Sequence, residues 1–489
     1  MSPLDRRDFV RALATAGLAA SSPVSAQQPP GRTETTSAAT APVVPPPVTR
    51  TLARYLVSAR SEDLPKQVRD ESARTLLNWV GSALGGSRHE TVDIAIAAVA
   101  PFAGPPQASV LGRRERMDVM NAALMNGISS HIHDFDDTHL KTVIHPAGPV
   151  ASAILALAEF QPVSGRDFMH ALVLGVETEC RIGNAVYPAH YDRGWHITGT
   201  AGVFGAAVAA GHLLKLTEQQ MVWAIGLAAV QPVGLREMFG SMTKSFHPGR
   251  AAQNGLMAAF LASRNYTSSD AGLEAKSGWA NVVSTEQKYG EITNELGTRY
   301  ETALNSYKPF ACGIVIHPTI DACIQLRKEY ALRADMIERI NLRVHPLVLE
   351  LTGKKAPQTG LDGKFSVYFA AAVAIVRGGG GVAEFSDATV KDPAIVALQD
   401  RVTATIDPSI HQDQVRALVT LRDGRRIEKY IEHAVGSIDR PMTNTDLEAK
   451  FLGNATGVLP ADRARALIDL CWRAETLPRA AAIADAARA

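Results

Sequence analysis

The chain of 489 residues has few of the features that mark metal-binding, membrane or nucleic-acid-binding proteins. Its four cysteines are widely spaced and form no metal-type pair, and nothing in their spacing demands a disulfide, so the state of Cys312 and Cys323 stays open. A formal net charge of +1 gives no electrostatic reason to bind nucleic acid or an anionic membrane. The best apolar stretch, residues 199–214, is too short and too rich in glycine and alanine to span a membrane.

Cofactor motifs are missing as well. No GxGxxG sequence follows a predicted strand and no Walker sequence is present, so nucleotide binding has little support. Hydrophobic residues make up 46% of the chain, which fits a globular enzyme with a large core. We therefore expect an enzyme without a cofactor or a metal ion, with no nucleic-acid partner and no membrane span.

The first 48 residues differ in composition from the rest. Residues 5–9 (Asp-Arg-Arg-Asp-Phe) precede a mildly apolar stretch, and residues 24–26 (Val-Ser-Ala) resemble a cleavage site. This order predicts a twin-arginine signal peptide over residues 1–26 and a periplasmic location. Residues 27–48 are rich in proline, threonine and alanine, which predicts a disordered linker.

Periodicity predicts a mainly α protein with two domains. Residues 49–305 repeat apolar positions at helical spacing, for example over 68–80, 118–132 and 165–186, the last with Ser164 as N-cap. Residues 306–437 predict a smaller α+β lid domain, with strands over 340–346 and 402–406, a helix over 366–376 and a hairpin of 415–421 with 426–431. In that hairpin, Asp423-Gly424 favours a two-residue turn. The tail, residues 438–489, is helical again.

The most informative segment is residues 131–145, which contain four histidines and three aspartates. Such groups are costly to bury without partners, yet an apolar run that predicts a buried helix follows directly at Val150. Acid–base chemistry by imidazole and carboxylate is the favoured interpretation. Metal ligation stays open, although His131 and His133 lack the i, i+4 spacing of a zincin helix. A third interpretation, a structural polar helix end whose hydrogen bonds are all satisfied, also stays open.

Five motifs in order resemble the MmgE/PrpD family, which includes 2-methylcitrate dehydratases, cis-aconitate decarboxylases and an iminodisuccinate epimerase. They are residues 134–150 (Asp-Phe-Asp-Asp-Thr, then His-Pro-Ala-Gly-Pro-Val), 194–198 (Gly-Trp-His-Ile-Thr), 244–255 (from Lys-Ser-Phe-His-Pro-Gly-Arg), 308–321 (from Lys-Pro-Phe-Ala-Cys) and 364–368 (Lys-Phe-Ser-Val-Tyr). The resemblance runs from about residue 51 to the end. It implies that the tail packs back on the helical domain and that the protein is a homodimer.

The resemblance and the chemistry of the side chains together select the candidate site. By resemblance to the decarboxylases, active-site positions fall on Asp134, Thr138, His145, His196, Lys244, Lys308 and Tyr368. His145 and His196 can serve as acid and base, and Asp134 can orient a histidine. Carboxylates of a substrate can be held by Lys244, Lys308, His247 and Arg250, with Thr138 and Tyr368 as further substrate-binding residues. Residues 249–252 can open a helix that adds backbone amides to an anion site.

This set predicts a lyase of the dehydratase type, a carbon–oxygen lyase, that acts on a small di- or tricarboxylate such as 2-methylcitrate. Two departures from the cis-aconitate decarboxylases argue against decarboxylation of cis-aconitate. Gly313 stands where they carry a histidine, and the loop from Thr138 to His145 is one residue longer. Epimerisation or decarboxylation of a related polycarboxylate stays an alternative. A second alternative is a periplasmic protein that binds polycarboxylates without catalysis.

Overall fold

The computed structural model describes residues 46–489. The predicted signal peptide, residues 1–26, and nearly all of the predicted linker, residues 27–48, lie outside that range. At the linker's end the prediction is wrong, because Val48 begins the first described helix, α2 (Val48–Ser58), and is buried. No helix within residues 46–489 has both the length and the apolarity needed to cross a membrane.

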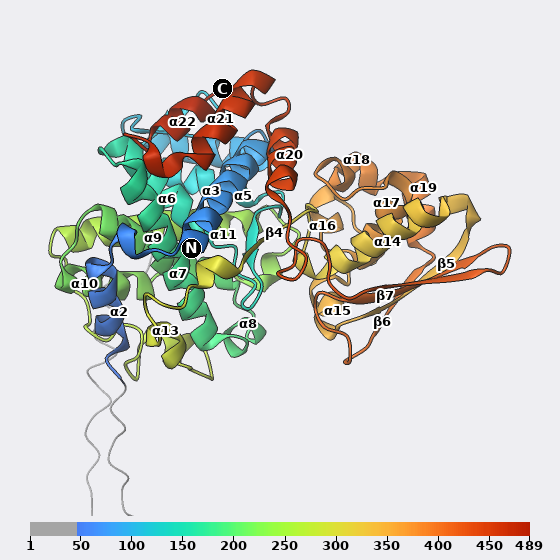
Figure 1. Cartoon of the computed structure of the whole chain (residues 1–489), viewed down its shortest axis with the longest axis horizontal. Helices are drawn as coiled ribbons and strands as arrows, with labels where there is room; N and C mark the ends of the chain where they lie inside the picture. Colours follow the sequence, from blue (N-terminus) through green and yellow to red (C-terminus); the bar gives the residue numbers. More distant parts are fainter. Residues whose placement is uncertain (1–45) are drawn as a thin grey trace, which may run out of the picture. The chain divides into compact units, whose positions relative to one another are not determined.

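Helices make up most of the first part of the described chain (Figure 1). The longer ones enclose two apolar clusters. Their bounds are α2, then α3 (Lys66–Gly86), α4 (Glu90–Val99), α5 (Val119–His131), α6 (Ala147–Phe160), α7 (Gly165–Val186), α8 (Ala189–Asp192), α9 (Ile197–Leu213), α10 (Glu218–Ala229), α11 (Thr243–Ser263), α12 (Trp279–Val283) and α13 (Gly290–Thr293).

Several helix boundaries follow from their capping residues. The Ser164 side chain accepts a hydrogen bond from the backbone of Asp167, so α7 has the predicted N-cap and the predicted range. Asp118 caps α5 in the same way, through the backbone amides of Met120 and Asn121. The apolar run after Val150 lies in α6 and is buried, as predicted.

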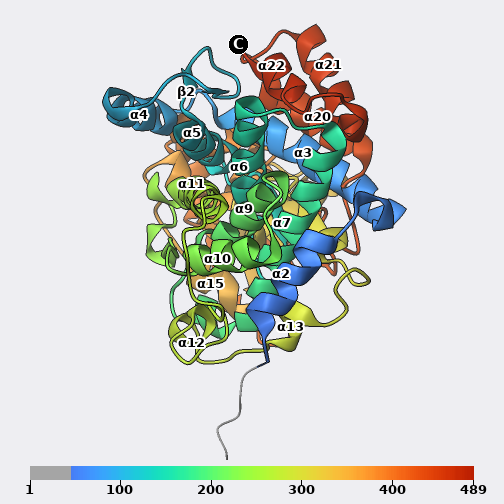
Figure 2. The ribbon, with the colours of Figure 1, turned by 90° about the vertical axis from the view of Figure 1, so that its left-hand side faces the viewer.

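Helix α9 lies in the middle of the helical part, with α6, α7, α10 and α11 packed around it (Figure 2). Small residues permit this packing. A Cβ on Gly255 of α11 would lie 2.5 Å from the Cβ of Ala206 in α9, which is well inside van der Waals contact. A second close crossing joins α5 and α11, because a Cβ on Gly127 would lie 2.4 Å from the Cα of Gly249. This crossing brings the start of α11 beside the end of α5.

The second part is an α+β unit built on a four-stranded sheet of order β6-β5-β7-β8. Strands β5 (Ile337–Val344) and β6 (Val402–Ile406) are parallel, whereas β7 (Val415–Leu421) is antiparallel to both β5 and β8 (Arg426–Ile431). The helices that share its apolar cluster include α14 and α17. The helices of this part are α14 (His317–Tyr330), α15 (Pro346–Thr352), α16 (Gly360–Gly363), α17 (Val367–Arg377), α18 (Asp387–Val390) and α19 (Pro393–Gln399).

The predicted β7–β8 hairpin forms, but its turn is longer than predicted. The backbone amide of Leu421 donates to the carbonyl of Arg425, which leaves a loop of residues 422–424. Gly424 has a φ of +87° there. A left-handed residue after a tight turn is the usual geometry of a three-residue hairpin loop, so Asp423-Gly424 does not form a two-residue turn.

The last helices pack on the helical part of the chain. Helix α20 (Asn444–Ala455) lies beside α3 (Figures 1 and 2). Its Phe451 is buried in the same apolar cluster as Trp79 of α3. Helices α21 (Ala461–Trp472) and α22 (Ala482–Ala487) follow and add Leu467 and Ile483 to that cluster.

Two short strand pairs complete the fold. Strand β1 (Ala108–Ser109) pairs with β2 (Arg116–Met117). More important for the site, β3 (Asp137–His139) pairs antiparallel with β4 (Asn305–Tyr307), with Asp137 opposite Tyr307. This pairing places Lys308 next to the segment that carries Asp134 and Thr138. The four cysteines all lie among the described residues and are buried free thiols, so Cys312 and Cys323 are not bonded to each other.

Candidate active site

The histidine- and aspartate-rich segment forms the end of α5 and the loop that leads to α6. Two residues of this loop have left-handed backbone angles, with φ of +50° at Asp134 and +54° at Val143. Valine is β-branched and rarely adopts this conformation. Strained backbone of this kind clusters at functional sites, where the surrounding structure holds it in place.

Asp134 lies between two buried lysines. Its Oδ1 accepts hydrogen bonds from Lys308 Nζ at 2.5 Å and from Lys244 Nζ at 3.2 Å. Burial raises the pKa of Asp134, but the two ammonium groups outweigh burial and hold the pKa well below its ordinary value. Asp134 is therefore an ionised partner of the lysines, rather than the residue that orients a histidine as the sequence predicted.

Lys308 and Lys244 differ in how many of their hydrogens are already engaged. Lys308 Nζ donates to Oδ1 of Asp134, to the carbonyl of Asp134 at 3.2 Å and to the carbonyl of Cys312 at 3.2 Å. An ammonium group has three donors, so these bonds use all of them. Lys244 Nζ donates to Asp134 and to His131, which leaves one donor for a ligand.

His131 connects Lys244 to a second carboxylate. Its Nδ1 lies 2.7 Å from Oδ2 of Asp136, and its Nε2 lies 2.7 Å from Lys244 Nζ. Burial lowers the pKa of His131, with Asp136 opposing the effect and Lys244 adding to it. A neutral His131 that donates from Nδ1 to Asp136 can accept at Nε2 from the lysine. The three residues therefore form a continuous hydrogen-bonded chain, Asp136–His131–Lys244.

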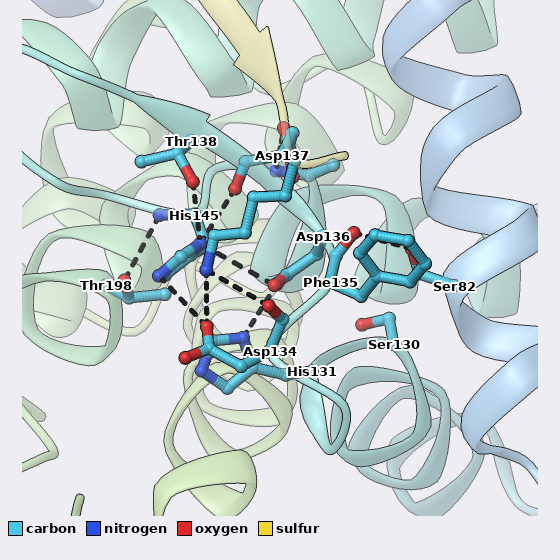
Figure 3. Close-up of polar contacts among 12 residues, drawn as sticks. Ser82, Ser130, His131, Asp134, Phe135, Asp136, Asp137, Thr138, His145 and Thr198 are labelled. Carbon is cyan, nitrogen blue, oxygen red and sulfur yellow. Dashed lines mark hydrogen bonds and ion pairs between the residues drawn. The ribbon is translucent and has the colours of Figure 1, made fainter. Parts of the chain in front are cut away.

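His145 is oriented by the backbone. Its Nδ1 lies 2.7 Å from the carbonyl oxygen of Asp137, to which only a protonated Nδ1 can donate. The Thr138 hydroxyl lies 3.3 Å from the same nitrogen, and Nε2 lies 3.9 Å from Oδ1 of Asp134. Asp134, Asp136 and His145 point toward one another in Figure 3. Burial is the main reason that the pKa of His145 lies well below the ordinary histidine value, so Nε2 is an unprotonated base near neutral pH.

His196 stands at the start of α9 and is backed by His247. The two Nδ1 atoms lie 2.8 Å apart, so one ring donates to the other and Nε2 of His196 is left for other partners. Burial, followed by His247 and Lys244, holds the pKa of His196 well below its ordinary value. Burial also lowers the pKa of His247 to about 3. Both rings are therefore neutral at pH 7.

These side chains surround a small cavity of about 30 Å³. That volume is room for about one or two water molecules, so a carboxylic acid substrate needs the cavity to widen. Helical-part and lid residues both contribute to the walls, which are formed by Asp134, Val143, His145, Tyr191, His196, Phe239, Lys244, Lys308, Gly313, Ile314, Val315, Leu351, Thr352 and Phe365.

Five of the residues selected from the sequence line this cavity: Asp134, His145, His196, Lys244 and Lys308. Thr138 and His247 lie behind the wall, where they contact His145 and His196.

Arg250 and Tyr368 are not at the cavity. Arg250 is exposed and its guanidinium bonds Gln253. It lies six residues after Lys244 on α11, about 240° around the helix, so it faces another way. Residues 249–252 also do not open a helix, because α11 begins at Thr243 and runs through Pro248. Tyr368 lies in α17 and packs in the apolar cluster of the α+β unit.

The structure adds residues that sequence reasoning did not select. His131 belongs to the predicted polar segment, but nothing in the sequence selected it over the other histidines there. Its contact with Lys244 identifies it as part of the site. Two further lysines hold the surrounding backbone. The buried Lys364 donates to the carbonyls of His133 and Ala311, and the partly exposed Lys450 of α20 donates to those of Phe135 and Lys308. Burial lowers the pKa of Lys450 to about 7.

Some of these groups are suitable ligands for a metal ion. Ligand atoms of His131, His145 and His196 lie within 4.8 Å of one another, as do those of His131, Asp134, Asp136 and His145. However, the Lys244 ammonium already bonds Nε2 of His131 and Oδ1 of Asp134. A cation there would compete for these lone pairs and be repelled by both lysines. The arrangement favours proton transfer.

Comparison with known proteins identifies the family. The MmgE/PrpD N-terminal domain matches residues 50–292, and the MmgE/PrpD C-terminal domain matches residues 310–474. The chain is 28% identical to the cis-aconitate decarboxylase-like protein oryM of Aspergillus oryzae, over 85% of this chain and 92% of that protein. It is 26% identical to the human cis-aconitate decarboxylase, over 88% and 92%. It is 23% identical to the 2-methylcitrate dehydratase of Salmonella typhimurium, over 82% and 89%. The two domain matches cover most of the chain, which therefore belongs to the MmgE/PrpD family.

Proposed function

We propose that this protein is a lyase of the dehydratase type that removes water from a small β-hydroxy di- or tricarboxylate without a cofactor. The observation that carries this proposal is the pairing, in one buried cavity, of a lysine with a free donor and a histidine whose unprotonated Nε2 is held in place. Lys244 can bind a carboxylate through a charge-assisted hydrogen bond, and His145 can accept the proton next to it.

The reaction follows from these two groups. The carboxylate beside the acidic carbon binds Lys244, whose positive charge stabilises the negative charge that develops as the proton leaves. His145 Nε2 takes that proton, and the electrons of the C–H bond form the C=C bond. The C–O bond breaks with its electron pair on oxygen. The imidazolium of His145 returns the proton to the departing hydroxide, so water leaves and the charges balance. His196 Nε2 contacts the hydroxyl and orients it.

Positioning is the task of the remaining groups. The Asp137 carbonyl keeps hydrogen on Nδ1 of His145 and so leaves Nε2 as the base. The Asp136–His131 pair holds the Lys244 ammonium. Lys308 and Asp134 fix the loop, since Lys308 has no donor left for the substrate.

The direct test is turnover. Purified protein is incubated with citrate, 2-methylcitrate, malate and alkyl-substituted malates, and products are followed by NMR after removal of metal ions with a chelator. We expect an unsaturated acid and water as products, with His145→Ala as the matched inactive control. Exchange of the α-proton in heavy water without elimination would instead support epimerisation. A folded protein that neither converts nor exchanges any of these acids contradicts the proposal, and a melting-temperature shift alone would support the non-catalytic binding protein.

Decarboxylation is the second candidate. The relatives named cis-aconitate decarboxylase are 26% identical to the chain and the decarboxylase-like protein oryM is 28% identical, whereas those named 2-methylcitrate dehydratase are 23–24% identical. The same Lys244 could stabilise the charge left when a C–C bond breaks. Release of carbon dioxide from cis-aconitate, measured beside water elimination, separates the two activities.

Export and assembly are part of the proposal. Residues 5–9 and 24–26 support periplasmic export by the twin-arginine route, and fractionation of cells that express the Arg6→Lys, Arg7→Lys variant should show loss of export. A homodimer is supported by the family resemblance. Light scattering at micromolar concentration should give twice the mass of one chain, and a monomer would contradict it.

A further inference from the structure

The cavity has two chemically different faces. One carries the charged and titratable groups of Asp134, His145, His196, Lys244 and Lys308. The other is apolar and is formed by Val143, Phe239, Ile314, Val315, Leu351 and Phe365. Four of those six apolar residues come from the segments 314–315, 351 and 365. Four of the five polar residues come from the helical part. Tyr191 and Thr352 add hydroxyl groups to the lining, but all of the charged groups belong to the first face.

The charges of the polar face are already balanced. Lys244 and Lys308 carry positive charge, and Asp134 and Asp136 carry negative charge within hydrogen-bond reach of the lysines or of His131. His131, His145 and His196 are neutral by burial. Lys308 has no free donor, so a single N–H of Lys244 is the remaining cationic contact of this face. Each further carboxylate in the cavity would have no cation of its own, which is costly in a buried site.

Two of the three cations beyond the apolar face are also engaged. A surface basin of about 800 Å³ shares Phe239 and Leu351 with the cavity and holds Arg193, Arg236 and Lys354. Arg236 pairs with Glu350, and Lys354 pairs with Asp362 at 2.6 Å. The basin therefore offers a long substrate a mixture of charges, whereas the wall between basin and cavity is apolar.

We infer that the substrate is a β-hydroxy acid with no more than two carboxylates and with an alkyl substituent that packs on the apolar face, rather than a tricarboxylate. This inference rests on the proposed dehydratase function and makes its substrate class narrower. The carboxylate next to the acidic carbon binds Lys244, and the alkyl group lies against Val315, Leu351 and Phe365.

Substrate preference tests the inference. The values of kcat/KM are compared for malate, 2-methylmalate, 2-butylmalate and citrate. We expect kcat/KM for 2-butylmalate to exceed those for malate and citrate by at least tenfold, since buried alkyl carbons favour binding and an unmatched carboxylate opposes it. A kcat/KM for citrate equal to or above that for 2-butylmalate overturns the inference and leaves the dehydratase function intact.

A matched pair of variants tests the apolar face itself. Leu351 is half-buried between cavity and basin, so an arginine there can keep its guanidinium near water. Leu351→Arg should raise the ratio of citrate to 2-butylmalate turnover at least tenfold, whereas Leu351→Ala should lower 2-butylmalate turnover without raising that of citrate. Equal ratios in both variants would overturn the inference. If no acid is turned over, the dehydratase function fails, and the melting temperature with 2-butylmalate or citrate still reports which class the cavity prefers.

Discussion

Lys308 Nζ lies 2.5 Å from Oδ1 of Asp134, although 174 residues separate the two along the chain. The contact depends on the pairing of β3 with β4, which places Lys308 directly after the strand opposite the Asp134 loop. It connects the first residue after β4 to a loop residue with a left-handed backbone conformation. Two buried opposite charges thereby join the helical part to the start of the lid segment.

This ion pair predicts a coupling in stability. Lys308→Met removes the cation nearest to Asp134 and should lower the free energy of unfolding by about 3–5 kcal/mol, because it leaves a buried carboxylate with only Lys244 as partner. Asp134→Asn/Lys308→Met should be less destabilised than the sum of the single variants. Urea denaturation of all four proteins measures the coupling. Strictly additive effects would contradict the pairing.

His145 is predicted to carry the proton transfer. His145→Ala should lower kcat by on the order of 10²–10⁴, the usual contribution of a positioned general base. His433→Ala is a suitable control, because His433 lies outside the cavity and its side chain is 40% exposed. Both variants should keep the circular dichroism spectrum of the wild type. Near-wild-type kcat in His145→Ala would mean that the polar cluster is structural.

Lys244 is predicted to bind the substrate carboxylate. Lys244→Met removes the one free ammonium donor of the cavity and should raise KM roughly 10- to 150-fold, which corresponds to a charge-assisted hydrogen bond of about 1.5–3 kcal/mol. Arg250→Met changes a cation on the same helix that faces away from the cavity, and it should leave KM unchanged. Steady-state kinetics of the wild type and both variants measure KM. An equal rise of KM in both variants would point to a general effect of charge.

Asp137 predicts a pH dependence of stability. Burial, with a smaller contribution from Asp136, raises the pKa of Asp137 from 3.8 to about 7. The folded state then binds more protons than the unfolded state between pH 4 and 7, so the free energy of unfolding falls as pH rises through this window. The loss from this group is on the order of 4 kcal/mol at most.

The variant Asp137→Asn should flatten that dependence. Its side-chain oxygen can still accept from Asn305 and from the backbone of Ala147, whose bonds Asp137 accepts now. Urea denaturation at pH 4.5 and pH 7.5 should give a smaller difference in the variant than in the wild type. The exposed Asp462→Asn serves as control. An unchanged difference in Asp137→Asn would show that this carboxyl group does not titrate in the window.

Local sequence determined the secondary structure of much of the chain. The 3.6-residue period and Ser164 predicted α7, because capping and one-sided apolar patterns act over a few residues. The alternating strands around Asp423-Gly424 predicted β7 and β8, whereas the length of their turn depends on the register of the ladder. Likewise, the density of histidine and aspartate before a buried helix was enough to mark residues 131–145 as the candidate site.

The tertiary structure decided which of the marked side chains meet. Lys244 and Arg250 belong to one motif, yet only Lys244 faces α5, because α11 begins at Thr243 and crosses α5 at Gly127 and Gly249. The partner of His131 is a lysine 113 residues away. The number of free donors on a lysine is likewise invisible in sequence, since it depends on carbonyls brought together by strand pairing. Short-range patterns select residue types, whereas hydrogen bonds and charge balance arise from contacts between distant segments.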